Sequence, residues 1–106
     1  MTKIYSIHSL PVAPDLSVAE PSVTVIEGGA ATLTCLATGD PAPVQTWSRN
    51  GNELTSGGRY QISSDGRVLT VQGVTEAQDE GEFTCHASNM AGNDSADITL
   101  NVLSKQ

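Results

Sequence analysis

Apolar and polar residues alternate along much of this chain. In residues 95–102, Ala, Ile, Leu and Val occupy every second position, with Ser, Asp, Thr and Asn between them. Residues 31–37 and 22–27 show the same period of two. This alternation predicts strands with one buried face, because successive side chains of a strand point to opposite sides. Only residues 75–81 are expected to form a helical turn, and they are too few for a longer helix.

Turn-forming residues divide the chain into short extended segments. Asn50-Gly51 and Asp65-Gly66 predict hairpins with type I′ turns, since that turn needs a positive φ at both central residues. Pro21 is expected to bend the first extended segment or to hold it at a sheet edge, where a missing N–H does little harm. Many short strands with frequent turns favour an all-β sandwich or barrel.

The adjacent residues Cys85 and His86 raise the question of a reactive thiol or a metal site. In the predicted strand around them, Cys85 shares a face with Phe83 and His86 points the other way, so His86 cannot act as a base toward Cys85. The other histidine, His8, lies near the N-terminus, and the four residues lack the close paired spacing of a zinc site. Cys35 has the same inward phase as Cys85. We therefore favour a disulfide between them over a reactive thiol.

Length and charge narrow the classes of function. The 106 residues suffice for one domain, and twelve acidic against five basic residues give a formal net charge of −7. Such a surface repels phosphate and anionic lipid, so nucleic acids and membranes are poor partners. Residues 1–14 contain no continuous apolar segment typical of a signal peptide, and we interpret the chain as one module of a larger protein. No catalytic, cofactor-binding or metal motif is recognised, so we expect neither an enzyme nor a small-molecule substrate.

The order Cys35, Trp47, Cys85 resembles that of immunoglobulin domains. Residues 39–47, GDPAPVQTW, are similar to the run that leads into the third strand of I-set domains. Residues 69–85, LTVQGVTEAQDEGEFTC, resemble the I-set signature that ends at the second cysteine. The interval between the cysteines leaves little room for the extra strand of variable domains, which favours the I-set.

This resemblance implies an all-β, two-sheet antiparallel Greek-key sandwich with one inter-sheet disulfide over residues 14–104, and an N-terminal extension or linker over residues 1–13. The implied core includes Trp47, Leu69 and Phe83. Phe83 stands where the family usually has Tyr, so the tyrosine-corner hydrogen bond cannot form; such a bond contributes only about 1 kcal/mol, and the fold should tolerate its loss. The resemblance also implies a structural ion pair between Arg59 and Asp79.

The same resemblance implies a non-catalytic protein-recognition or adhesion module. Hemicentin-like and cell-adhesion proteins suggest an extracellular glycoprotein, whose protein partner could be a second copy. Titin-like and palladin-like proteins suggest the alternative, a structural spacer of an intracellular muscle or cytoskeletal protein with reduced thiols. Asn93 begins the sequon Asn93-Asp94-Ser95, a candidate N-glycosylation site if the chain is secreted.

The expected partner surface is the outer face of the sheet that carries the second cysteine, with Thr84, His86 and Met90 as its candidate contact residues. This surface is expected only if the module binds a protein, and the residue types by themselves favour an ordinary solvated face. The acidic residues between positions 76 and 82 lack the ordered ligand spacing of a calcium loop, which favours plain surface charge.

Overall fold

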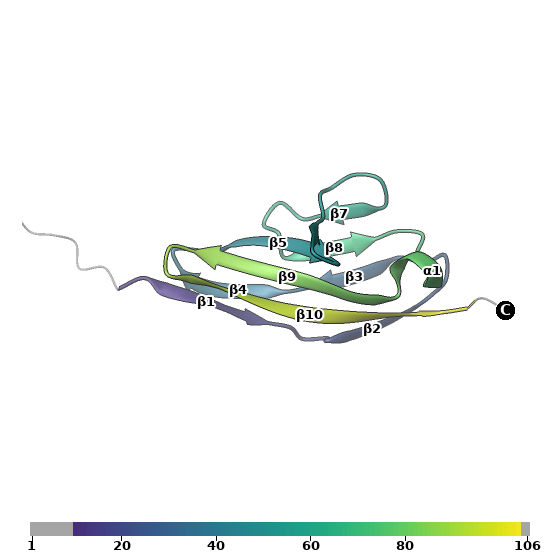
Figure 1. Cartoon of the computed structure of the whole chain (residues 1–106), viewed down its shortest axis with the longest axis horizontal. Coiled ribbons are helices and arrows are strands. Elements are labelled where there is room, and N and C mark those ends of the chain that lie inside the picture. Colours follow the sequence, from purple (N-terminus) through teal and green to yellow (C-terminus); the bar gives the residue numbers. More distant parts are fainter. Residues whose placement is uncertain (1–9, 105–106) are drawn as a thin grey trace, which may run out of the picture.

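The computed structural model describes residues 10–104, in which ten strands and one helical turn form two packed layers (Figure 1). The elements are β1 (Val12–Ser17), β2 (Ser22–Ile26), β3 (Ala31–Thr34), β4 (Leu36–Asp40), β5 (Val44–Arg49), β6 (Asn52–Glu53), β7 (Tyr60–Ile62), β8 (Val68–Val71), α1 (Glu76–Asp79), β9 (Gly81–Asn89) and β10 (Gly92–Leu103). One layer has the strand order β2-β10-β9-β5-β6. The other contains β3-β8-β7 and the pair β1-β4, because only Cys35 separates β3 from β4. The predicted two-sheet sandwich is confirmed.

The core follows from the period-two pattern. On β9 and β10, the side chains of Phe83, Cys85, Ile98 and Leu100 face inward and have no exposed surface. The other fully buried side chains of the core cluster come from the facing layer, from β5 and from the segment before α1: Ala31, Leu33, Cys35, Trp47, Leu69, Val71 and Val74. Burial of these apolar side chains is the main force that holds the two sheets together.

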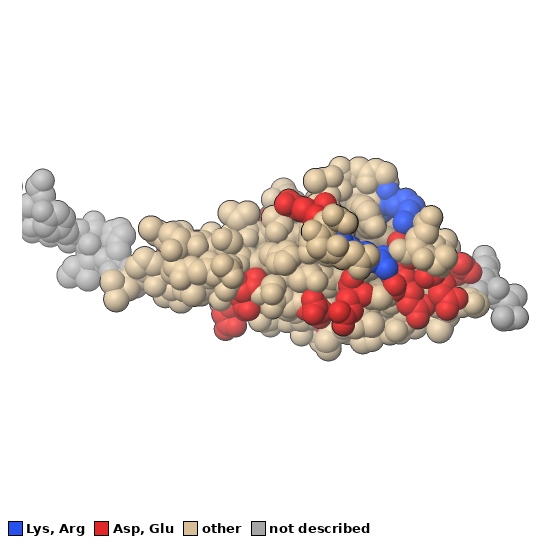
Figure 2. All heavy atoms as spheres, viewed as in Figure 1, with Lys and Arg blue, Asp and Glu red and all other residues tan. Residues whose placement is uncertain are grey.

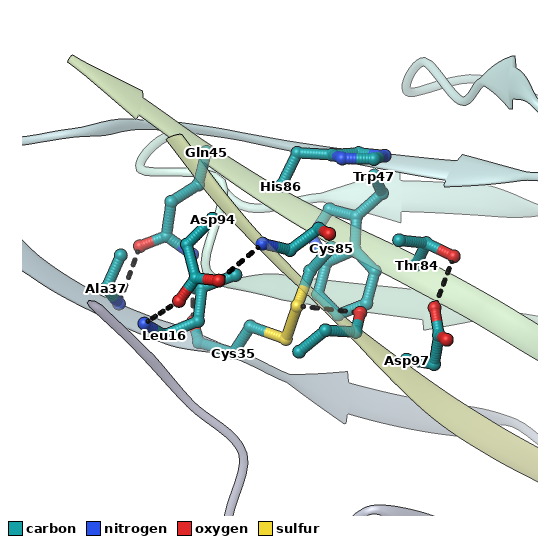
Figure 3. The surroundings of a disulfide bond; sticks show 12 residues. Leu16, Cys35, Ala37, Gln45, Trp47, Thr84, Cys85, His86, Asp94 and Asp97 are labelled. Atoms are coloured by element: carbon teal, nitrogen blue, oxygen red, sulfur yellow. Dashed lines mark hydrogen bonds between the residues drawn. A yellow bond between two sulfur atoms is a disulfide. The ribbon is translucent and has the colours of Figure 1, made fainter. Parts of the chain in front are cut away.

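The predicted disulfide joins Cys35 to Cys85 across the two layers, with their Cα atoms 6.6 Å apart. Trp47 lies beside it (Figure 3), and its indole Nε1 donates a hydrogen bond of 2.9 Å to the carbonyl of Gly66. Because Cys85 is part of this bond, it is not available as a nucleophile or a metal ligand.

The first extended segment changes sheets at Pro21. β1 pairs with β4 in one layer, whereas β2 runs parallel to β10 in the other, so the sandwich is not purely antiparallel. Pro21 precedes β2, and its carbonyl accepts a hydrogen bond from the backbone N–H of Thr99. β1 begins at Val12, which pairs with Asp40. Residues 12 and 13, which we assigned to the extension, therefore belong to a strand, and residues 1–9 lie outside the described part.

One of the two predicted turn types is confirmed and one is wrong. Asn50 and Gly51 both have positive φ, 53° and 80°, and connect β5 to β6 as a type I′ turn requires. In the hairpin of β7 and β8, Gly66 has a φ of 76° but Asp65 does not have a positive φ. Gly66 is the fourth residue of a turn, and its N–H donates a hydrogen bond to the carbonyl of Ser63, the first residue.

Candidate functional site

Three cross-strand rows of outward side chains cross β10, β9 and β5, and the pair Glu82–Thr99 continues the same face toward α1 on β9 and β10 alone. Because the strands are in register, each row takes one residue from each strand. From the α1 end toward the β9–β10 turn, the rows are Ser48–Thr84–Asp97, Thr46–His86–Ser95 and Val44–Ser88–Asn93. We call these nine side chains, together with Met90 in the turn, the outer face.

Two hydrogen bonds link side chains of neighbouring strands on the outer face. His86 Nε2 and Ser48 Oγ lie 2.7 Å apart, and Thr84 Oγ1 donates to Asp97 Oδ1 over 2.7 Å. The bond between Thr84 and Asp97 is drawn in Figure 3. There the side chains of Thr84 and His86 point away from the disulfide that Cys85, between them in β9, forms with Cys35. The two bonds hold the middle of the face in one arrangement, which lowers the entropy lost when a partner binds.

Apolar side chains are exposed where the outer face meets the β9–β10 turn. Met90 is 78% exposed and Val44 is 68% exposed. The long thioether side chain of Met90 is able to adapt its shape to a contacting surface. The turn end of the outer face therefore combines exposed apolar surface with the ordered polar rows beside it.

The turn end of the outer face carries little charge for so acidic a chain, whereas Glu82 and Glu53 border its other end. Asp97 is the one acidic side chain among the ten members of the outer face, and none of them is Lys or Arg. Figure 2 shows the end with the β9–β10 turn almost free of charged atoms, whereas acidic and Arg side chains gather toward α1. On the side seen in this view, charged side chains are thus concentrated away from the turn end.

The candidate glycosylation residue Asn93 is exposed near the start of β10. It pairs with Ser88 and points outward in the last row of the outer face. The next residue, Asp94, turns the other way: its Oδ2 accepts a hydrogen bond of 2.9 Å from the N–H of Leu16 and ties β1 to β10 (Figure 3).

Arg59 and Asp79 form the ion pair that the resemblance implied. Two hydrogen bonds, of 2.8 and 3.0 Å, join the guanidinium of Arg59 to the carboxylate of Asp79. The side chain of Asp79 has no exposed surface. Burial by itself raises the pKa of Asp79. The hydrogen bonds from Arg59 and from the N–H of Thr75, with the charges of Arg59 and Arg49, outweigh burial and hold that pKa below its usual range. The pair therefore links the end of α1 to the residue directly before β7.

A second role of Arg49 has no signal in the sequence. Its guanidinium donates to the carbonyls of Gln78 and Glu80, each over 2.7 Å, and lies 4.6 Å from the centre of the Phe83 ring. These bonds tie the α1 corner to β5. Arg49 therefore supports the corner where Phe83 lacks the hydroxyl of the family's usual Tyr.

The described residues contain no cluster suited to catalysis by a metal. Within residues 10–104, no group of three His, Cys, Asp or Glu side chains is placed to hold a metal ion. In the same residues no helix has the length and apolar character needed to cross a membrane.

A two-layer sandwich with a central disulfide packed on a tryptophan defines an immunoglobulin-like domain. The family model described as the immunoglobulin I-set domain matches residues 14–102, and the chain belongs to this family.

Similar proteins include very long ones. The chain is 44% identical over 85 residues to the human protein named probable oxidoreductase PXDNL, covering 79% of the chain and 6% of that protein. It is 33% identical over 103 residues to mouse hemicentin-1, covering 96% of the chain and 2% of that protein. The chain thus spans a small part of the curated relatives it matches. A crystal structure of a complex of titin M10 and obscurin-like 1 Ig domains matches it with a TM-score of 0.79 and 29% identity, covering 90% of this chain and 98% of that one.

Proposed function

We propose that this chain is a non-catalytic protein-recognition module that binds its partner through the outer face, with Thr84, His86 and Met90 in the contact. The observation that carries the proposal is the low charge of the turn end of this face, away from Glu82 and Glu53, on a chain with a net charge of −7. The centres of protein–protein interfaces are depleted of charged residues and enriched in side chains such as Met. The bonds of Ser48 to His86 and of Thr84 to Asp97 add polar groups in fixed positions.

We further propose that the parent protein is extracellular and that Asn93 carries a glycan there. The disulfide between Cys35 and Cys85 supports an oxidising compartment. The second candidate is a structural spacer of an intracellular protein, and the similarity to a titin domain favours it. The intact mass of protein from its native compartment, before and after reduction and deglycosylation, separates the two.

The contact proposal is tested with the double variant His86→Glu, Met90→Glu. Tetramers of the domain, which raise the apparent affinity by avidity, are tested against the immobilised domain and against a panel of cell surfaces. We expect the wild-type tetramer to bind at least one of them and the double variant to lose most of this binding. Two carboxylates would have to be desolvated in the contact, which disfavours binding.

A matched control carries the same added charge on the opposite layer. Thr32 and Gln61 are exposed on β3 and β7, so Thr32→Glu, Gln61→Glu introduces two carboxylates without touching the outer face. Both variants are first shown to have the melting temperature of the wild type. Binding by the His86, Met90 variant equal to that of the control would contradict the proposed contact. A wild-type tetramer that binds nothing would favour the spacer.

A further inference from the structure

Within the described residues, β4 (Leu36–Asp40) has a neighbouring strand on only one of its two edges. β1 pairs with β4 along one edge. On the other edge, the pairing with β8 (Val68–Val71) ends beside Thr34, and the last hydrogen bond is the one of 2.9 Å from the N–H of Cys35 to the carbonyl of Arg67, just before β8. Beyond Cys35, residues 36–40 continue as a strand with no strand beside them on that edge. An unpaired edge presents backbone groups that can pair with another chain.

The first position on this open edge is filled by a side-chain amide. Gln45 Nε2 donates to the carbonyl of Cys35 over 3.0 Å, and Gln45 Oε1 accepts from the N–H of Ala37 over 3.2 Å. The second bond is drawn in Figure 3, where the side chain of Gln45 points toward Ala37. The amide of Gln45 thus makes the two hydrogen bonds that the N–H and C=O of one residue in a parallel neighbouring strand would make. The edge therefore already binds an amide in the manner of a sheet.

The next backbone groups on the same edge are the carbonyl of Ala37 and the N–H of Gly39. Successive residues of a strand direct their hydrogen-bonding groups to alternate edges, so residues 35, 37 and 39 share the edge that Gln45 contacts. Both groups point away from β1. Within residues 10–104, neither the Ala37 carbonyl nor the Gly39 N–H has a side-chain partner or a backbone partner on this edge. Both groups are free to pair with a ligand.

A cleft of about 530 Å³ lies along this edge. Its lining comes from β4, from the loop into β5 and from the β7–β8 turn: Ala37, Thr38, Gly39, Ala42, Pro43, Val44, Gln45, Ser64, Asp65 and Arg67. The turn is a fixed wall, because Gly66 packs against the backbone of Gln45 and accepts the hydrogen bond from Trp47. A cleft of this volume is in the range that holds small ligands, including a few residues of extended chain.

The charges at the cleft differ in what they already bind. Asp65 accepts hydrogen bonds from Ser63 Oγ and from the N–H of Arg67, and these bonds, with a smaller contribution from the charge of Arg67, lower its pKa. The guanidinium of Arg67 makes no hydrogen bond or ion pair to another side chain among the described residues. Arg67 therefore leaves a cationic group at the cleft for an acidic side chain of a ligand.

We propose that this cleft binds a short, extended, acidic peptide segment of another protein by strand addition to β4. The segment accepts a hydrogen bond from the N–H of Gly39 and donates one to the carbonyl of Ala37, and its carboxylate contacts Arg67. The site is separate from the outer face and does not depend on the function proposed for that face.

The test uses the whole chain labelled with nitrogen-15 and the probe peptide acetyl-Thr-Val-Glu-Val-Thr-amide at millimolar concentration. We expect amide resonance shifts confined to residues 37–39 and 63–67, with slower hydrogen exchange of the Gly39 N–H. The same peptide with N-methyl groups on its Val and Glu amides cannot donate these bonds, and we expect it to cause no shift. A probe with Gln in place of Glu should bind more weakly.

Two variants complete the test. Ser64→Trp fills the cleft from its exposed wall and should abolish the shifts, whereas Thr32→Trp, on the outer side of β3, should leave them unchanged; both are checked for an unchanged melting temperature. Shifts that are absent with the probe, equal with the N-methylated peptide or located on another edge would overturn the proposal. Protection of Gly39 that rises with protein concentration without peptide would also overturn it, since the occupant would then be a second copy.

Discussion

At the scale of single residues, Asp79 is a carboxylate that stays charged although its side chain has no exposed surface. Arg59, Arg49 and the N–H of Thr75 supply the charges and hydrogen bonds that compensate for its burial. Because these partners lower its pKa in the folded state, the unfolded chain takes up the proton first as the pH falls. The stabilisation from Asp79 is therefore present above pH ~4, the ordinary Asp value, and is lost as the pH falls through the lower folded pKa.

The variant Asp79→Asn should lower the free energy of unfolding at neutral pH by about 2 kcal/mol, because Arg59 loses its charged partner but stays partly exposed to water. Its stability should also depend less on pH below pH ~4 than that of the wild type. Urea unfolding at a series of pH values measures both effects. Asp97→Asn, an exposed change on the outer face, is the control, and equal pH dependence of the Asp79 variant and wild type would contradict the assignment.

At the scale of elements, the β7–β8 turn depends on contacts that are distant in the sequence. A Cβ on Gly66 would overlap the carbonyl oxygen of Gln45, and Gly66 also has a positive φ. Gly51 in the β5–β6 turn has a similar φ of 80°, but a Cβ there would meet nothing within 4 Å. The two glycines thus separate backbone conformation from close packing.

Gly51→Ala should cost about 1 to 2 kcal/mol, the strain of a left-handed conformation. Gly66→Ala should cost roughly 3 kcal/mol or more, because the turn must also move away from β5 and weaken the bond to Trp47. Chemical denaturation of both variants gives the difference. Equal losses would mean that the turn shifts freely and is not a rigid wall of the cleft.

The contrast between the turns also marks what the sequence can predict. Alternation placed Cys85, Ile98 and Leu100 in the core, because the period of a strand is local information. The type I′ turn at Asn50 was likewise predictable from two adjacent residues. The amide of Gln45 on the open edge was not, since its partners are known only once β4 and β5 face each other.

Three further features could not be read from the sequence for the same reason. The parallel pairing of β2 with β10 depends on the chain changing sheets after β1. The bonds of Arg49 to Gln78 and Glu80 connect residues about thirty positions apart. The conformation at Asp65 depends on the packing of Gly66 against β5 rather than on the Asp-Gly pair itself.

At the scale of the whole molecule, the disulfide connects the two layers at the centre of the core. Its cysteines are 50 residues apart in the sequence, so the bond restricts a long loop of the unfolded chain. Domains of this size are stable by about 5 to 15 kcal/mol, and a loss of a few kcal/mol is a large fraction of that. The redox state of the compartment therefore bears directly on how stable the module is.

Replacing both cysteines, Cys35→Ala with Cys85→Ala, should lower the free energy of unfolding by about 4 kcal/mol. Urea unfolding of the variant, compared with oxidised and reduced wild type, measures the loss. Reduced wild type should resemble the variant. A loss below about 1 kcal/mol would show that apolar packing around Trp47 alone holds the layers together. The module would then be stable in a reducing compartment as well.

Asn93, the proposed glycosylation site, lies on the outer face beside the proposed contact residue Met90. Its side chain leaves the sheet in the same row as Val44 and Ser88, next to the turn that carries Met90. A glycan attached there is bulky and hydrated, and it would stand over the surface that a partner has to cover. Occupancy of the sequon and binding through the turn end of the outer face would then be mutually exclusive. A cell that glycosylates only some copies would hold a masked and an adhesive population of one sequence.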